Sequence, residues 1–152
     1  MDVAIINPFI ASVTDVMPQL GFERVILKEQ REKTKKIIAS GIVLTLGIVG
    51  DKKGNVAYAI DTEGAKKIAS IMMMGMPVDE LDDMAKSAIS ELSNMLTANA
   101  SINFCNDSIN IDISPPTMLS GDNIELSMSK DHVVCVEFDI DGINMEINVA
   151  LE

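Results

Sequence analysis

The sequence is poor in the residues that most often build metal and nucleic-acid sites. It has one histidine, two cysteines and no tryptophan, and neither Cys105 nor Cys135 stands at a metal-ligand spacing. Lys and Arg total 12 against 23 Asp and Glu, giving a formal net charge of −11. This charge argues against a nucleic-acid partner, because nucleic acids are bound mainly through basic side chains on phosphates. It also disfavours an anionic membrane surface.

Long apolar runs and targeting signals are also missing. No apolar run approaches the roughly 20 residues that cross a bilayer, and no basic stretch opens the chain as it would open a signal peptide. Two cysteines are too few for a disulfide framework. We therefore expect a cytoplasmic protein with reduced thiols and no membrane insertion.

The sequence does contain enough apolar material for a core. Its 152 residues are 47% hydrophobic, but only four Phe and one Tyr are aromatic. The core must therefore be built from aliphatic residues and the eleven methionines. This length and composition predict one domain spanning residues 1–152.

Hydrophobic periodicity predicts three helices, at residues 7–20, 62–75 and 78–103. Asn7 followed by Pro8 is typical of a helix start, and Thr62 is the expected N-cap of the second helix. Asp79 and Glu80 suit the first turn of the third helix, where negative charge favours the helix dipole.

Alternating apolar residues predict strands at 22–30, 37–50, 55–60, 108–114, 124–128, 132–140 and 143–151. Two pairs of them form hairpins, which turn at Asp51–Gly54 and Asp141–Gly142. A loop is expected from Pro115 through Gly121. Residues 28–36 are charged and lack apolar periodicity, which indicates an exposed charged edge.

The order of elements repeats. Each half begins with a helix, continues with a strand and ends in a long hairpin, over approximately residues 7–61 and 78–152, with the helix at 62–75 linking them. This order predicts an α+β fold with pseudo-two-fold symmetry, in which long helices pack on one side of a mainly antiparallel sheet.

A polar stripe on the third helix is the candidate functional surface. Ser87, Glu91 and Asn94 stand at i, i+4 and i+7, and so fall within about 60° of arc on one helix face. They lie on the margin of an apolar face, where a partner can reach them, and the small Ala98 leaves room for that partner. The solvent face is expected to hold Asp82, Asp83, Lys86, Ser90, Ser93 and Thr97. The alternative is that the stripe consists of ordinary polar boundary residues.

If the halves are equivalent, the first helix should echo this stripe. At the same spacing it offers Ser12, Val16 and Gln19. The serine is kept, but valine replaces the carboxylate and glutamine replaces the asparagine. We therefore expect one intact site, in the second half.

The pattern Ser87-x-x-x-Glu91-x-x-Asn94 in a duplicated α/β domain resembles the CheC/CheX/FliY family of chemotaxis phosphatases. In the family pattern a proline follows the asparagine some twenty residues later, and Pro116 falls one residue short of that position. With one intact motif and one degraded copy, the chain looks more like CheX than like CheC.

This resemblance implies a phosphatase that acts on a phospho-aspartyl response regulator of the CheY type. Asn94 would orient the attacking water, Glu91 would pair with the regulator's lysine, and Ser87 would let the helix approach, with Ala98 and Pro116 as further binding positions. It implies no cofactor or metal on this chain, magnesium on the partner regulator, and a homodimer.

Two alternatives remain at the level of the sequence. The same fold can serve as a non-catalytic scaffold of the flagellar-switch kind, which binds a regulator or self-associates. The methionine-rich run comprises Ile71, Met72, Met73, Met74 and Met76. It indicates either adaptable core packing or a surface that binds a partner.

Overall fold

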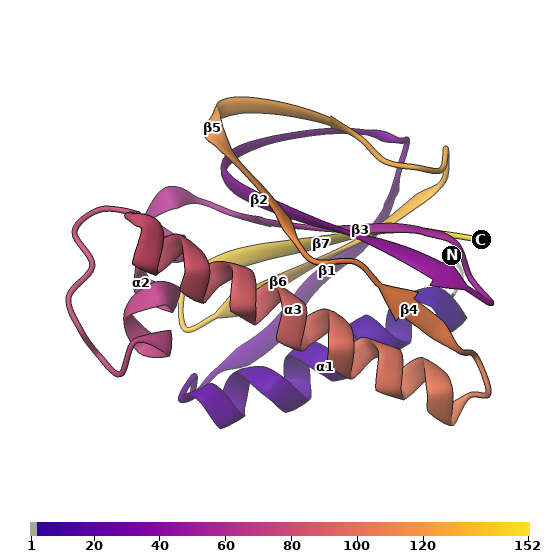
Figure 1. Cartoon of the computed structure of the whole chain (residues 1–152), viewed down its shortest axis with the longest axis horizontal. Coiled ribbons are helices and arrows are strands. Elements are labelled where there is room, and N and C mark those ends of the chain that lie inside the picture. The colour runs from indigo at the N-terminus through magenta and orange to yellow at the C-terminus, as the bar shows by residue number, and fades with distance from the viewer. Residues whose placement is uncertain (1–2) are drawn as a thin grey trace.

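The computed structural model describes residues 3–152, in which three helices cover one face of an antiparallel sheet (Figure 1). The α+β fold expected from the sequence is therefore confirmed. The helices are α1 (Val3–Leu20), α2 (Thr62–Met72) and α3 (Asp83–Asn106). The strands are β1 (Val25–Lys33), β2 (Lys36–Gly50), β3 (Gly54–Ile60), β4 (Ile111–Ile113), β5 (Thr117–Ser127), β6 (Val133–Ile140) and β7 (Ile143–Leu151).

The sheet is assembled by exchange between the two halves of the chain. Its order is β1-β6-β7-β3-β2-β4, and β5 also pairs with β2. The hairpins β2–β3 and β6–β7 lie together at the centre, where β3 pairs with β7. The outer strand of each half pairs with the hairpin of the other half, β1 with β6 and β5 with β2. This order reads alike from both sides, as a pseudo-two-fold arrangement requires; the repeat boundaries at 7–61 and 78–152 stay a prediction.

The two faces of the sheet are covered differently. The main core lies between the sheet and α1, α2 and α3, and it includes the fully buried Phe9, Leu46, Leu96 and Phe104. A smaller cluster covers the other face, where β2 and β5 form a ribbon that arches over the sheet (Figure 1). Small residues of the central strands let this ribbon approach closely: Ala57, Ala59 and Ala150.

Helix α1 is apolar enough, by length and composition alone, to cross a membrane. Its apolar residues are instead used inside the protein. Ile6, Val13 and Met17 are fully buried, and the ring of Phe9 packs edge-on against Phe104 of α3, with the ring centroids 5.9 Å apart. Helix α1 is therefore a core helix in this structure.

Helix α3 is fixed to the scaffold by buried hydrogen bonds. The hydroxyl of Ser12 on α1 donates to the carbonyl of Leu96 over 2.6 Å. The Thr97 hydroxyl donates to the Ser93 carbonyl, so the Tyr58 hydroxyl of β3 is the donor in its 2.8 Å bond to Thr97. Burial raises the pKa of Tyr58 far above its ordinary value, which keeps this donor protonated.

Two of the three helices begin at a different residue from the one expected, and α2 begins at Thr62 as expected but has a different cap. Helix α1 starts at Val3 because Ile5 and Ile6 extend its buried face, and Pro8 lies inside it. Helix α2 is capped by Asp61, whose carboxylate accepts from the backbone N–H of Gly64, so Thr62 is its first helical residue. It also ends at Met72, three residues before the expected end.

Helix α3 starts later than expected, at Asp83, because the carboxylate of Asp82 accepts from the backbone N–H of Ala85 and caps the helix there. Asp79 and Glu80 therefore lie in the preceding loop. The helix also buries Ser93 and Thr97, which the sequence pattern had placed in solvent. Their hydroxyls donate to backbone carbonyls within the helix, and these hydrogen bonds offset the free-energy cost of burying a polar group.

The second half of the sheet also differs from expectation. The strand expected at 108–114 is reduced to β4, and the loop expected through Gly121 is part of strand β5. The reason is the length of β2, which offers partners to β5 from Thr45 back to Lys36. Local sequence does not reveal such a long-range partner.

The charged edge expected at 28–36 is confirmed, although most of it is strand: β1 runs to Lys33 and is the terminal strand in the sheet order. Its cations pair inward, Arg31 with Glu146 over 2.6 Å and Lys33 with the same carboxylate over 3.3 Å. Burial acts to raise the pKa of Glu146, but the two cations outweigh it and hold that pKa below its ordinary value.

The anchor of α3 gives a test of the fold. Tyr58→Phe removes one buried hydrogen bond and leaves Thr97 bonded to Ser93, so it should lower the free energy of unfolding by about 1 kcal/mol. Thr97→Val leaves the buried Tyr58 hydroxyl without a partner and should cost more, about 1–3 kcal/mol. Urea unfolding of both variants measures the difference. Equal costs would contradict the view that the buried Tyr58 hydroxyl depends on Thr97 as its partner.

Candidate functional site

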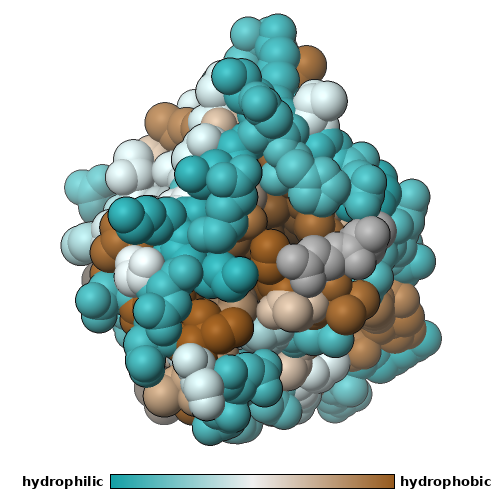
Figure 2. Space-filling view, turned by 90° about the vertical axis from the view of Figure 1, so that its right-hand side faces the viewer, coloured by the Kyte–Doolittle hydropathy of each residue, from teal (hydrophilic) through white to brown (hydrophobic). Residues whose placement is uncertain are grey.

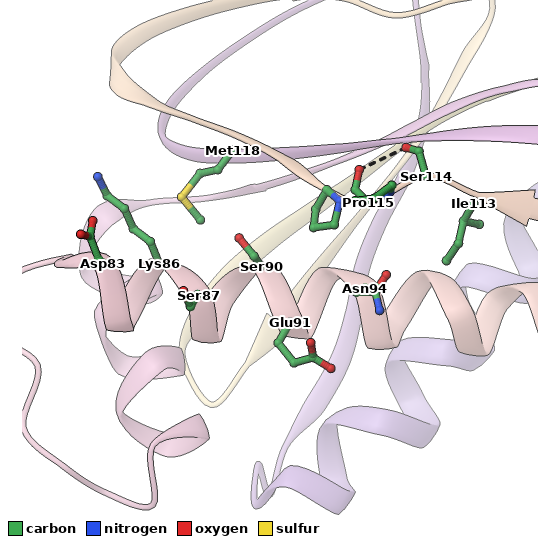
Figure 3. Close-up of a pocket in the computed structure, with 11 residues that line it drawn as sticks. Asp83, Lys86, Ser87, Ser90, Glu91, Asn94, Ile113, Ser114, Pro115 and Met118 are labelled. Carbon is green, nitrogen blue, oxygen red and sulfur yellow. Dashed lines mark hydrogen bonds between the residues drawn. The ribbon is translucent and has the colours of Figure 1, made fainter.

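A groove runs between α3 and the segment that contains β4 and the start of β5, with a cavity volume of about 770 Å³ (Figure 3). The structure brings four of the five expected site residues to this groove: Ser87, Glu91, Asn94 and Pro116. Ala98 is half-buried one turn beyond Asn94 and does not line it. The remaining lining residues are Asp83, Lys86, Ser90, Ile113, Ser114, Pro115 and Met118.

The far wall of the groove depends on the two prolines. Strands β4 and β5 both pair with β2, and Pro115–Pro116 interrupts the line between them because proline has no N–H to donate. Ser114 holds this break in place: its hydroxyl accepts from the backbone N–H of Gly47 and donates to the carbonyl of Pro115. The prolines are thus presented toward α3.

The polar side chains on the outer face of α3 point to two different sides of the helix. In Figure 3, Lys86 and Ser90 point from α3 toward the β4–β5 side, whereas Glu91 points away from it. Ser87 and Glu91 are exposed, and Asn94 is half-buried. A partner that contacts both Glu91 and the groove must therefore sit astride α3.

The polar side chains at this site are not engaged within the protein. Across residues 3–152, the side chains of Lys86, Ser87, Ser90, Glu91 and Asn94 make no hydrogen bond or ion pair with another residue. Farther along the same helix, by contrast, Ser93 and Thr97 are bonded. One cation, one carboxylate, one carboxamide and two hydroxyls are thus available to a second molecule.

Metal chemistry has no ligand set of its own in the described chain. Residues 3–152 contain no group of three or more His, Cys, Asp and Glu side chains placed to hold an ion. What the groove offers is hydrogen bonding and charge. A carboxamide such as Asn94 both donates and accepts, so it can orient a water molecule without acting as a strong base.

Sequence reasoning missed part of this site. Lys86, Ser90 and Asn94 are spaced by four, so they form a second row beside the stripe, and this spacing was the available signal. Ser114 and Met118 come from the opposite wall, and no local pattern connects them with α3.

The echo of the stripe on α1 is not accessible. Ser12 is buried and its hydroxyl donates to the carbonyl of Leu96 on α3. Val16 is also buried, whereas Gln19 is exposed. This face of α1 therefore serves to pack the two long helices together.

Comparisons with known proteins show the family to which this chain belongs. The family model described as "Chemotaxis phosphatase CheX" matches residues 42–139. The CheY-P phosphatase CheX of Thermotoga maritima is 35% identical over 127 residues, which cover 83% of this chain and 81% of that protein. The chain belongs to the CheX family of chemotaxis phosphatases. This membership makes it an enzyme of the phosphatase class.

Solved CheX structures share the whole fold. A CheX protein from Desulfovibrio desulfuricans superimposes with a TM-score of 0.86 at 20% identity, covering 97% of this chain and 99% of that one. The CheX–CheY–BeF3–Mg complex of Borrelia burgdorferi matches with a TM-score of 0.83 at 24% identity and 97% coverage of both chains. These likenesses establish a CheX-type fold.

The lack of internal partners at the site predicts how its variants fold. Glu91→Ala and Asn94→Ala break no bond within the protein and place a better helix former in α3, so the free energy of unfolding should stay within about 0.5 kcal/mol of wild type. Thermal unfolding followed by circular dichroism measures this. A loss of 2 kcal/mol or more, roughly the cost of breaking a buried bond, would assign these side chains a structural role instead.

Proposed function

We propose that this chain removes the phosphoryl group from a phospho-aspartyl response regulator of the CheY type in the cytoplasm. Support comes from the Thermotoga maritima relative, which is a CheY-P phosphatase, and from the Borrelia burgdorferi CheX, which was crystallised with CheY. The observation that carries the proposal is the set of polar side chains on α3 that line one groove and make no hydrogen bond or ion pair within residues 3–152.

Asn94 is the residue proposed to act at the phosphoryl group. In the reaction, a water oxygen attacks phosphorus, the bond between phosphorus and the aspartyl oxygen breaks, and the aspartate leaves as a carboxylate. Both water protons go to the inorganic phosphate as it forms, and one of them can then be released to solvent. The Asn94 carboxamide would accept a hydrogen bond from this water and donate to a phosphoryl oxygen, which holds the water in line with the breaking bond.

Glu91 is proposed to fix the regulator on α3. Its exposed carboxylate makes no ion pair with any residue from 3 to 152, so it can pair with the lysine beside the regulator's aspartyl phosphate. A charge-assisted hydrogen bond of this kind orients the helix as well as binding it. Magnesium would be held by the regulator, so this chain would not need to supply a metal. Ser87 is small and lets the regulator approach α3, and Pro116 forms the wall behind the phosphoryl group.

Two substitutions separate these roles. Asn94→Ala should lower kcat by about 100-fold or more, because it removes a group that positions the reacting atoms, and should leave the affinity for the regulator unchanged. Glu91→Ala should weaken the complex by about 30-fold or more as well as slow the reaction, since a desolvated ion pair at an interface is lost. Decay of the radiolabelled phospho-regulator gives kcat and KM, and calorimetry gives affinity.

The same assay decides between phosphatase and scaffold. A non-catalytic scaffold would bind the regulator without shortening the lifetime of its phosphoryl group. Asn94→Ala dephosphorylating as fast as wild type would contradict the proposed mechanism, whatever its affinity.

We also propose that the chain is a homodimer, as its resemblance to CheX implies. The terminal strand β1 is a candidate edge, because it pairs only with β6 in the sheet and exposes Ile26 and Leu27. Sedimentation equilibrium at micromolar concentration should give twice the chain mass. A monomer there would contradict the dimer.

A further inference from the structure

Three methionines are exposed near the N-terminus of α3. The side chains of Met74, Met76 and Met84 are 96%, 56% and 62% exposed, and we call these three residues the methionine surface. Their neighbours Met72 and Met73 pack against the core. The methionine-rich run of the sequence is therefore divided between core packing and a solvent-facing cluster.

The turn that carries Met74 is held by its own hydrogen bonds. The backbone N–H groups of Met74 and Gly75 donate to the carbonyls of Ile71 and Ser70, and the Ser70 hydroxyl donates to the carbonyl of Met76. Met74 has a φ of +62°, a conformation that favours glycine over residues with a side chain. Met74 therefore adopts an unfavourable backbone conformation although its side chain is almost fully exposed.

A groove of about 340 Å³ adjoins these methionines. Its lining combines apolar residues with acidic ones: Met73, Met76, Pro77, Val78, Asp79, Glu80, Asp82 and Met84. Asp79 and Glu80 are exposed and carry no ion pair within the described residues. A ligand with an apolar centre and a basic flank is the chemistry that complements this surface.

The methionine surface is continuous with the polar stripe formed by Ser87, Glu91 and Asn94. Met84 stands three residues before Ser87 and seven before Glu91, which places all three within about 60° of arc on one face of α3. The loop that carries Met74 and Met76 joins the N-terminus of α3 at Asp83, which is also the end of the helix nearest to Ser87 (Figures 1 and 3). A globular partner astride Ser87–Asn94 extends naturally onto Met84 and this loop.

The geometry points to the methionine surface as a second docking site for the response regulator, which would receive an apolar patch flanked by Lys or Arg next to the regulator's phosphorylation site. This inference rests on the proposed function, because it names how the same partner is chosen. Methionine suits the role since its flexible, polarisable side chain adapts to different apolar shapes. A second copy pairing through this same surface is a poorer occupant, because the acidic Asp79 and Glu80 of the two copies would lie close together.

The variant Met74→Gly tests this inference with an inbuilt control for folding. Glycine adopts the observed φ without strain, so the melting temperature should stay the same or rise. Combined with Met84→Gln, it should raise KM for the phospho-regulator at least 10-fold and leave kcat within twofold. The matched control is Ile38→Gln, which removes an equally exposed apolar side chain (62%) from β2 and should change neither constant.

The acidic rim has its own test. Asp79→Asn combined with Glu80→Gln should raise KM and flatten its dependence on salt, because a rim charge acts mainly on association. A regulator with no basic flank would give no change in either quantity, and this result would overturn the charge component of the inference.

Binding to the regulator activated with BeF3 and Mg²⁺, measured by calorimetry, separates failure of this inference from failure of the proposed function. Unchanged affinity and KM in Met74→Gly/Met84→Gln, with wild-type phosphatase activity intact, would overturn the docking site alone. Wild-type chain that binds but does not dephosphorylate would overturn the phosphatase proposal, while weaker binding by the methionine variant would still support the docking site. A variant that alters the oligomeric state instead of regulator binding would assign the surface to self-association and overturn the inference.

Discussion

The attachment of α3 to the scaffold is the constraint on which the rest of the structure depends. Its buried stripe packs on the sheet, and hydrogen bonds from Ser12 and Tyr58 tie Leu96 and Thr97 to α1 and β3. These bonds connect elements more than thirty residues apart in sequence, so they fix the rotation of the helix as well as its position. Because rotation is fixed, the same residues of α3 always face outward.

This attachment allows the helix to divide its polar groups between structure and function. The buried hydroxyls of Ser93 and Thr97 satisfy backbone carbonyls, whereas Glu91 and Asn94 have no partner within residues 3–152. Because the helix backbone that carries these groups is fixed, binding a ligand has to order only their side chains. Figure 2 shows another side of the molecule, where apolar and polar residues are interspersed over the surface.

Much of the fold could be predicted because its signals are local. The hairpin turn at Asp141–Gly142, with both residues at positive φ, was evident from two letters of sequence, and the stripe on α3 follows from helical spacing. Features that depend on distant partners could not be predicted. Strand β5 runs through Gly121 because β2 is long enough to receive it, and Thr97 is buried because Tyr58 reaches it from β3. The capping residue of a helix was also hard to predict where two candidates are adjacent: Asp61, and not Thr62, caps α2.

Catalysis by the polar stripe of α3 (Ser87, Glu91 and Asn94), rather than stoichiometric binding, is the proposed role of this chain. It is tested most directly by the release of inorganic phosphate from a phosphorylated CheY-like regulator with the chain present at one hundredth of its concentration. The account predicts complete release well before the regulator loses its phosphoryl group unaided, with many turnovers per chain. Release that stops at one phosphate per chain, or that proceeds no faster than without the chain, would contradict it.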